Sequence, residues 1–382
     1  MARIRRFLSL LLAVSISATT YISILKWQPN KKIVWNEKLQ SLYQDFPFFE
    51  PRPTTFESRK REWEHYSDMS KNKTKARRLP DVVGIGVKKC GTDAVISFLR
   101  HHPFIKVPDD VETFFFNHKY NKGLNYYRSL MPEVAEHELI MEKTPAYFDC
   151  PPVTLPNRLY RDIPHAKLIL VLCDPVKRSF SDYAHERARY EISSKNRDVA
   201  EFETFDSYLD FYLDRVNRST SLNTSTTLYN HMSNYYKDHA ATLLTTGFYS
   251  VFLPRWTELF NSSRLMVISG EDILNNPGLQ MERIQDFLGI PKLLREGDFV
   301  KNPSNGFFCV RPWWKNYNFT AETNSVAGWE ENLSCLSKTK GRTRHKDGGM
   351  DANIKHVARL KALFEPFNEE LYQMTGIDYN MM

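Results

Sequence analysis

The segment Lys88–Thr92 combines two lysines, a glycine and a hydroxyl, directly after a β-branched run and before a helical pattern. A turn between a strand and a helix aims backbone N–H groups and the positive end of the helix at an anion. Gly91 would let the backbone approach closely, while a lysine and Thr92 add a point charge and a hydroxyl. The segment therefore predicts a phosphate-binding turn, although the pattern alone also suits an ordinary basic turn. It is too short for the GxxxxGK[ST] loop of ATPases.

A second strand-to-helix junction has residues of the same kind. Asp174 and Pro175 follow an apolar run, and Arg178, Ser179 and Ser181 open the next helical pattern. Serines in a first helical turn either cap the helix or bind a phosphate. Two such junctions would suit a nucleotide that carries phosphate groups at both of its ends.

Alternating strand and helix patterns surround these junctions from Pro80 onward. Short β-branched and apolar runs predict buried strands, and longer amphipathic runs predict helices. The alternation predicts an α/β fold with a central, mostly parallel sheet that is flanked by helices and binds ligands at the carboxyl ends of its strands. The predicted strands are Asp81–Val87, Ala166–Leu172 and Arg264–Ser269, and the predicted helices are Ala94–Arg100, Gly278–Leu288 and Asp351–Thr375.

The N-terminus predicts a membrane anchor. Arg3, Arg5 and Arg6 precede an apolar run at residues 7–25, which nearly matches the hydrocarbon thickness of a bilayer when it is helical. The basic flank favours a cytoplasmic N-terminus. We therefore expect residues 1–6 to be a cytoplasmic tail, 7–26 a transmembrane signal anchor, 27–79 a lumenal stem and 80–382 the folded domain. A signal peptide cleaved near Ser15 and Ser17 is the alternative.

Other features agree with a lumenal chain. The five cysteines form no CxxC pair and no Cys/His cluster spaced for zinc, so no metal site is indicated. The net charge of +7 suits an anionic ligand without identifying it, and a lumenal location argues against nucleic acid. Glycosylation sequons begin at Asn72, Asn217, Asn223, Asn261, Asn318 and Asn332.

A series of motifs carries a resemblance to a known family. In chain order the motifs are KKCGT (Lys88–Thr92), ETFFFN (Glu112–Asn117), EKTPAYF (Glu142–Phe148), CDPVKRSFSDY (Cys173–Tyr183), GFFC (Gly306–Cys309) and CLSKTKGR (Cys335–Arg342). Their order resembles that of the heparan sulfate glucosamine 3-O-sulfotransferases, and the resemblance covers residues 80–382, including the tail FEPFNEELYQMTG. EKTPAYF and the block from Cys309 through Cys335 to KGR are its most specific parts.

The resemblance implies a single sulfotransferase domain with P-loop-like phosphate-binding turns. It also implies a Golgi enzyme that transfers a sulfuryl group from 3′-phosphoadenosine 5′-phosphosulfate (PAPS) to the 3-hydroxyl of glucosamine in heparan sulfate, without a metal. Such a transfer needs a base for the acceptor proton and a cation at the leaving oxygen. By resemblance, Glu112 is the base, Lys89 lies at the bridging oxygen, and Lys143 lies between donor and glycan.

The resemblance further implies which residues contact the two ligands and which cysteines pair. The implied disulfide is Cys309–Cys335. The implied acceptor-binding residues are Glu112, Phe114, Asn117, Lys143, Thr144 and Pro145. The implied donor-binding residues are Lys89, Cys90, Gly91, Thr92, Asp93, Cys173, Ser181, Phe308, Lys340, Gly341, Arg342, Thr343 and Arg344.

This chain departs from the family pattern at several of these positions. The family usually has glycine in place of Cys90 and arginine in place of Asp93 and Cys173. Because a cysteine cannot make the bidentate phosphate contact of an arginine, the 3′-phosphate would need Arg178 or Lys177 instead. The ending of ETFFFN resembles the N-sulfotransferases. One alternative is therefore an N-sulfotransferase or another glycan sulfotransferase, and another is a catalytically inactive, heparan-binding Golgi protein.

Overall fold

The computed structural model describes residues 60–61, 63–65, 68, 74–149, 154–193, 202–220, 241–303, 306–311, 333–336 and 354–378. The predicted cytoplasmic tail, the predicted membrane anchor and most of the predicted stem lie outside the described residues. Within the described ranges, no helix is both long and apolar enough to cross a membrane.

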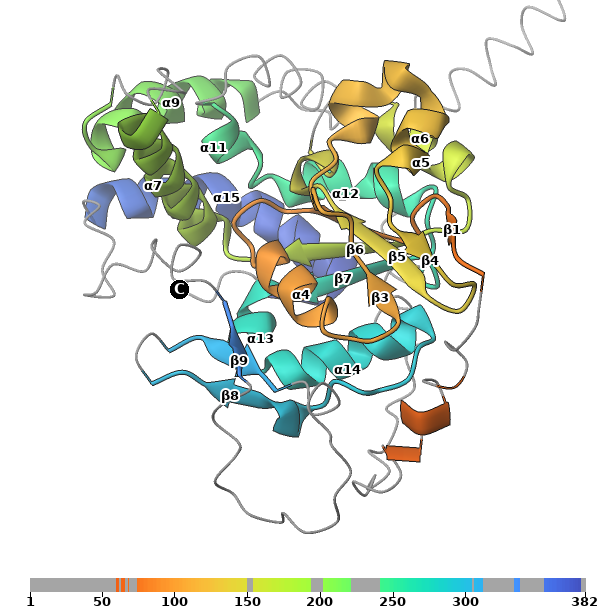
Figure 1. Cartoon of the computed structure of the whole chain (residues 1–382). Helices are drawn as coiled ribbons and strands as arrows, with labels where there is room; N and C mark the ends of the chain where they lie inside the picture. Colours follow the sequence, from red (N-terminus) through yellow and green to blue (C-terminus); the bar gives the residue numbers. More distant parts are fainter. Residues whose placement is uncertain are drawn as a thin grey trace, which may run out of the picture.

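A five-stranded parallel sheet forms the centre of the fold (Figure 1). Every residue of β2 and β7 is buried, which explains why these strands read as continuous apolar runs. The predicted α/β fold and its three predicted strands are confirmed. The remaining strands escaped prediction because β3 is short and β5 ends in the charged residues Glu142 and Lys143. The strand order is β3 (Ile105–Lys106), β5 (Leu139–Lys143), β2 (Val82–Gly86), β6 (Lys167–Leu172) and β7 (Leu265–Ser269).

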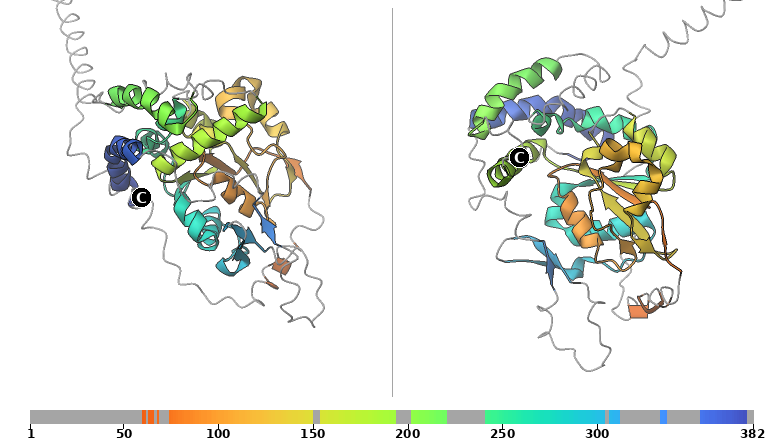
Figure 2. Two further views of the ribbon diagram at one scale, coloured as in Figure 1. Left: turned by 90° about the vertical axis from the view of Figure 1, so that its left-hand side faces the viewer. Right: turned by 45° about the horizontal axis from the view of Figure 1, so that its top comes forward.

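Helices cover both faces of this sheet (Figures 1 and 2). The connection from β2 runs toward the β3 edge, whereas the connection from β6 runs toward β7. Because parallel crossovers are right-handed, connections in opposite directions place their helices on opposite faces. One face carries α4 (Thr92–Leu99), α13 (Gly270–Asn275) and α14 (Pro277–Leu288), and the other carries α12 (Tyr249–Thr257) and α15 (Ile354–Thr375). The predicted helices are confirmed as α4, α14 and α15.

The remaining elements extend this core. Helices α7 (Pro175–Ser193), α9 (Phe205–Thr220) and α11 (Thr242–Thr245) gather near α15 (Figure 1). An antiparallel sheet contains β8 (Phe299–Lys301), β9 (Phe308–Val310) and β10 (Ser334–Cys335), and β1 (Ala76–Arg77) pairs with β4 (Glu133–Val134). The short helices are η2 (Phe115–Lys119), η3 (Tyr120–Lys122), α5 (Gly123–Ser129), η4 (Pro145–Tyr147), α6 (Leu155–Asp162) and η5 (Glu296–Asp298).

Two disulfides cross-link the described chain. Cys309 and Cys335 form the pair that the resemblance implies, and they join β9 to β10. Cys90 and Cys173 form a second bond that the sequence did not predict. The bonds span sequence separations of 26 and 83 residues. In the chain-entropy model these closures stabilise the fold by about 3.5 and about 4.5 kcal/mol.

A buried histidine predicts that acid destabilises the fold. His102 is 1% exposed, its Nδ1 accepts the N–H of Phe104 at 3.2 Å, and its Nε2 donates to the carbonyl of Pro291 at 2.8 Å. The contact at Nδ1 needs the neutral ring, and burial lowers the pKa of His102 to about 4 although the hydrogen bond to Pro291 opposes this shift. An unfolded histidine titrates near 6.5, so the unfolded chain binds more protons below that pH. The free energy of unfolding is therefore fully retained above about pH 6.5 and should fall by roughly 3 kcal/mol toward pH 4.

Urea unfolding at pH 7 and near pH 4.5 measures this loss. The His102→Gln variant keeps a donor toward Pro291 but has no titrating ring, so its free energy of unfolding should depend much less on pH over this interval. An equally steep decrease in the wild type and the variant would assign the acid sensitivity to other groups.

Candidate active site

The turn after β2 has the backbone conformation of an anion-binding loop. Lys89 and Gly91 both have positive φ, 74° and 95°, so successive N–H groups turn toward one side of the chain. The Gly91 carbonyl accepts the N–H groups of Ala94 and Val95 at 2.9 and 3.2 Å, which starts α4. Among the described residues, the N–H groups of Gly91 and Thr92 have no hydrogen-bond acceptor. Two backbone donors at the positive end of α4 therefore remain available for an anion.

Lys89 supplies a cation at the same turn. Its side chain is half-buried, and within the described chain it makes no hydrogen bond or salt bridge. Burial lowers the pKa of Lys89, and the negative charge of Asp182 opposes that effect in part. The predicted leaving-group lysine is thus placed where an anion could pair with it.

A buried carboxylate organises the acceptor side of the site. Glu142, the last but one residue of β5, has no exposed surface, and its oxygens accept hydrogen bonds from Tyr127 at 2.8 Å and from Thr113 and Thr144 at 3.0 Å. Burial raises the pKa of Glu142, and the donated hydrogen bonds oppose this. Because its neighbours fill every approach, Glu142 holds other residues in position and does not reach an acceptor.

Tyr147 binds the backbone of the motif ETFFFN. Its hydroxyl accepts the N–H groups of Phe115 and Phe116 at 2.9 and 3.3 Å, while the N–H of Phe114 donates to Thr144 at 3.3 Å. Phe114 has a left-handed backbone, with φ 51°. The motif EKTPAYF therefore fixes the turn that follows Glu112. Thr144 is fully buried, so in this structure it positions the site without touching an acceptor.

The predicted base, Glu112, and the predicted lysine, Lys143, meet at the carboxyl end of β5. Lys143 Nζ lies 2.6 Å from Glu112 Oε1 and also pairs with the Asp93 carboxylate. Burial alone would lower the pKa of Lys143, but Asp93 and Glu112 outweigh burial and raise it. The Lys143 side chain is 4% exposed, whereas those of Glu112 and Asp93 are 37% and 48% exposed. A buried ammonium thus orients two accessible carboxylates.

A glycine in β2 makes room for Lys143. Gly84 pairs with Lys143 across the parallel strands, and a Cβ at Gly84 would lie 3.0 Å from Lys143 Cγ. A larger residue there would push the lysine stem away from the turn after β2. The alternation of glycine and β-branched residues in β2 therefore serves packing at the site as well as the core.

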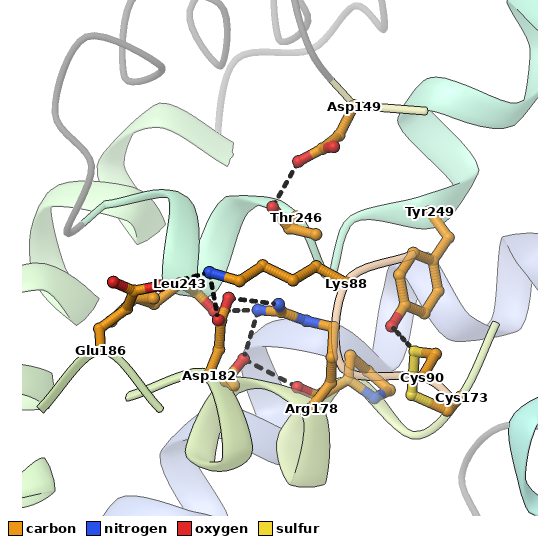
Figure 3. Close-up of polar contacts among 12 residues, drawn as sticks. Lys88, Cys90, Asp149, Cys173, Arg178, Asp182, Glu186, Leu243, Thr246 and Tyr249 are labelled. Atoms are coloured by element: carbon orange, nitrogen blue, oxygen red, sulfur yellow. Dashed lines mark hydrogen bonds and ion pairs between the residues drawn. A yellow bond between two sulfur atoms is a disulfide. The ribbon is translucent and has the colours of Figure 1, made fainter. Parts of the chain in front are cut away.

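The other cations at the two junctions are held by acids (Figure 3). Lys88 Nζ lies 2.8 Å from Asp182 and 2.5 Å from Glu186, and these carboxylates raise the pKa of Lys88 against the effect of burial. Arg178 has a fully buried side chain, lies 3.0 Å from Asp182 and donates to the carbonyl of Leu243. Arg178 therefore points into the protein and does not replace the arginine that the family usually has before Asp174.

Cys90 and Cys173 are joined to each other, although both were expected to contact the donor. Their side chains lie in a disulfide and the residues are 3% and 8% exposed. Their sulfur atoms are therefore committed to each other and are not available for a phosphate. Lys177 remains at this junction with a side chain that is 52% exposed and 3.7 Å from Asp174.

The remaining predicted site residues occupy varied positions. Ser181 is half-buried on α7, Asn117 is half-buried on η2, Pro145 is buried at the start of η4, and Phe308 is half-buried on β9. The sequon residue Asn261 is exposed, and Asn217 lies on α9. Outside the described residues lie Lys340, Gly341, Arg342, Thr343 and Arg344 of the implied donor loop, and sequons Asn72, Asn223, Asn318 and Asn332.

Sequence reasoning missed residues that support the site from a distance. Thr113, Tyr127 and Tyr147 bind the buried carboxylate or the ETFFFN turn, and Tyr249 packs beside the Cys90–Cys173 disulfide. Tyr147 lies inside a motif that the sequence singled out, but nothing marks Tyr127 or Tyr249. In the described ranges, no group of three or more His, Cys, Asp or Glu residues could hold a metal ion.

Comparison with known proteins places the chain in a family. The family model of the sulfotransferase domain matches residues 79–303. Human heparan sulfate glucosamine 3-O-sulfotransferase 3B1 is 34% identical over 306 residues, which is 80% of this chain and 65% of that protein. Mouse heparan sulfate glucosamine 3-O-sulfotransferase 6 is 32% identical over 305 residues, which is 79% of this chain and 74% of that protein.

The length and the fold of these proteins can also be compared. The chain spans slightly less than two thirds of the human relative, at 65% of its length. A solved sulfotransferase from Alicyclobacillus acidocaldarius superposes with a TM-score of 0.50 and 19% identity, over 79% of this chain and 97% of that one, and this likeness concerns the fold. The chain therefore belongs to the sulfotransferase family, and within it to the heparan sulfate glucosamine 3-O-sulfotransferases.

Proposed function

We propose that this chain transfers a sulfuryl group from PAPS to the 3-hydroxyl of glucosamine residues in heparan sulfate. The observation that carries the proposal is the placement of Glu112 and Lys143 beside an anion-binding turn that presents Lys89. Relatives that are 32% and 34% identical are named for this same transfer. The geometry supports the chemistry, and family membership supports the choice of acceptor and position.

The two junctions suit a donor with phosphate groups at both ends. β2 and β6 are hydrogen-bonded neighbours, so the turn at Gly91 and the start of α7 at Pro175 open at the same edge of the sheet. Free N–H groups and the Lys89 ammonium fit the phosphosulfate end. Lys177 and Ser181 are the candidates at the other end. When bound, the donor supplies a sulfuryl group that is attached to a phosphate leaving group.

Each residue of the site has a defined task in this reaction. Glu112 accepts the proton of the acceptor hydroxyl, so that the hydroxyl oxygen can form its bond to sulfur. Lys143 keeps Glu112 oriented through their 2.6 Å contact. Lys89 stabilises the negative charge that appears on the phosphate oxygen when the sulfur–oxygen bond breaks. Positioning supplies much of the remaining rate enhancement.

Asp93 is expected to limit binding of a polyanionic acceptor. It adds a second carboxylate to Lys143 and lies in the first turn of α4, directly after the anion-binding turn. Asp93→Asn removes one negative charge and should lower the KM for heparan sulfate about three- to tenfold at low salt. The KM difference should shrink near 0.5 M salt, because salt screens such charges.

Steady-state kinetics at two salt concentrations measures this effect. Glu365→Gln makes the same change of charge on the exposed surface of α15 and should leave the KM unchanged. An unchanged KM in Asp93→Asn at low salt would show that the Asp93 charge does not act on the acceptor.

The direct test of the proposed function is transfer of labelled sulfate from PAPS to heparan sulfate by the full chain. Disaccharide analysis of the product should find the label on the 3-hydroxyl of glucosamine. Label on the glucosamine nitrogen would favour the N-sulfotransferase alternative. Binding of heparan sulfate without any transfer would favour the inactive, heparan-binding alternative.

We also infer that the enzyme is a single-pass type II membrane protein of the Golgi with a lumenal catalytic domain. The apolar run at residues 7–25 and its basic flank support this inference. The exposed sequon at Asn261 agrees with a lumenal domain. Protease protection in intact Golgi vesicles, together with glycosidase shifts of the mass, tests the topology.

A further inference from the structure

We propose that the Cys90–Cys173 disulfide is a positioning element of the donor site, and that donor affinity depends on this bond. The inference rests on the proposed donor, PAPS, but it concerns a bond that joins the two strand-to-helix junctions. Cys90 lies in the turn after β2, and Cys173 directly follows the last residue of β6, two residues before α7 begins. The Cα atoms lie 5.3 Å apart. One covalent bond therefore links the two predicted phosphate-binding segments directly.

The bond restrains the most unusual part of the backbone. Lys89 and Gly91, on either side of Cys90, have φ values of 74° and 95°. A lysine rarely adopts a positive φ without restraint from its surroundings. Because the side chain of Cys90 is tied to Cys173, the bond restrains the backbone conformation of the two residues that flank it, Lys89 and Gly91.

The surroundings of the disulfide leave the turn little freedom on its inner side. A Cβ at Gly270, the first residue of α13, would lie 2.4 Å from the Cys90 carbonyl oxygen and 3.1 Å from Cys173 Cβ. The hydroxyl of Tyr249 lies 3.5 Å from Cys90 Sγ, and Tyr249 is 1% exposed (Figure 3). Cys90 is thus packed tightly against α12 and α13.

Charge pairing restrains Lys88 but leaves the Lys89 side chain without a partner in the described chain. Lys88 is bound to Asp182 and Glu186 on α7, and Arg178 of the same helix is buried against Asp182 (Figure 3). Lys89 has no salt bridge to any described residue. Lys88 therefore ties the start of the turn to α7, whereas no ion pair in the described chain holds the Lys89 side chain itself. The disulfide preorganises the turn, and preorganisation lowers the cost of binding.

Calorimetry with PAP, the desulfated donor product, tests the proposal in the full-length chain. The Cys150→Ser background removes the fifth cysteine and prevents mispairing, and its PAP affinity should equal that of the wild type. Adding Cys90→Ala and Cys173→Ala should raise the Kd for PAP about tenfold or more. In kinetics the KM for PAPS should rise similarly, while the KM for heparan sulfate changes less than about twofold. If the bond is purely structural, its removal will lower thermal stability without selectively raising the Kd for PAP and the KM for PAPS.

A second pair of substitutions and a reductant provide further tests of whether the disulfide controls donor affinity. Cys90→Ser with Cys173→Ser keeps the volume and a partner for Tyr249, so it serves if the alanine pair does not fold. A phosphine reductant should weaken PAP binding by the wild type and have little further effect on either double variant. Equal weakening in the double variants would assign the effect to Cys309–Cys335 and overturn the proposal.

The outcomes separate this inference from the proposed function. If the wild type binds PAP and the double variants bind it equally well, the disulfide has no role in donor positioning, and the proposed function stands. If the wild type itself does not bind PAP, the proposed donor is wrong and the inference falls with it.

Discussion

Replacing Glu112 with glutamine is expected to lower kcat about 10²–10⁴-fold, the usual contribution of a general base. Glutamine keeps the size and can still accept a hydrogen bond from Lys143, now 2.6 Å from the carboxylate, but it cannot take a proton from the acceptor hydroxyl. The Kd for PAP should change less than about threefold, because Glu112 lies on the acceptor side. Steady-state rates with heparan sulfate and calorimetry with PAP measure the two effects separately.

A matched control uses another partly exposed acid that pairs with a cation. Glu133 contacts Arg77 at 3.4 Å on β4, and Glu133→Gln should keep normal turnover. The assignment of Glu112 fails if Glu112→Gln retains near-normal kcat, or if PAP binding disappears together with activity. Glu142 is not a substitute base, because it is fully buried among hydroxyl groups.

Replacing Lys89 with alanine should weaken PAP binding and abolish measurable transfer. A lost charge-assisted contact to phosphate lowers affinity by about 10–100-fold. Loss of charge stabilisation on the leaving oxygen should lower kcat by a further factor of about 10²–10³. We expect the wild type to bind PAP with a Kd that is roughly micromolar or tighter. Calorimetry and single-turnover rates at saturating PAPS separate the two losses.

A control variant and the pH dependence of donor affinity test the prediction for Lys89 further. Lys122→Ala removes an exposed lysine next to Tyr126 and should change neither quantity. Burial lowers the pKa of Lys89, so this lysine loses its charge at a lower pH than an exposed lysine does. As the pH is raised, the affinity for the donor should therefore begin to fall earlier than it would if the lysine were exposed. Normal transfer by Lys89→Ala would mean that another cation stabilises the leaving oxygen.

Several strands, the anion-binding turn and the candidate catalytic residues can be predicted from short stretches of the sequence. Strands such as β2 and β6 are continuous apolar, β-branched runs because both of their faces are buried. The turn at Gly91 is visible because glycine and lysine occur where a strand passes into a helix. The motifs and their order also identify Glu112, Lys143 and Lys89 by resemblance, and the structure brings Glu112 and Lys143 into contact.

Other properties depend on which strands become neighbours. β5 is hard to predict because Glu142 and Lys143 carry charge, and their burial becomes favourable only when hydroxyls and carboxylates from other segments surround them. The Cys90–Cys173 bond joins residues that are 83 positions apart, and it exists because β2 lies beside β6. Arg178 has the right type and position for phosphate binding, yet Asp182 and the Leu243 carbonyl turn it inward. Local sequence determined the helices, the strands and the types of reactive residue. The tertiary structure decided which charged side chains are free for ligands, because a buried charge must be paired with groups that the fold places beside it.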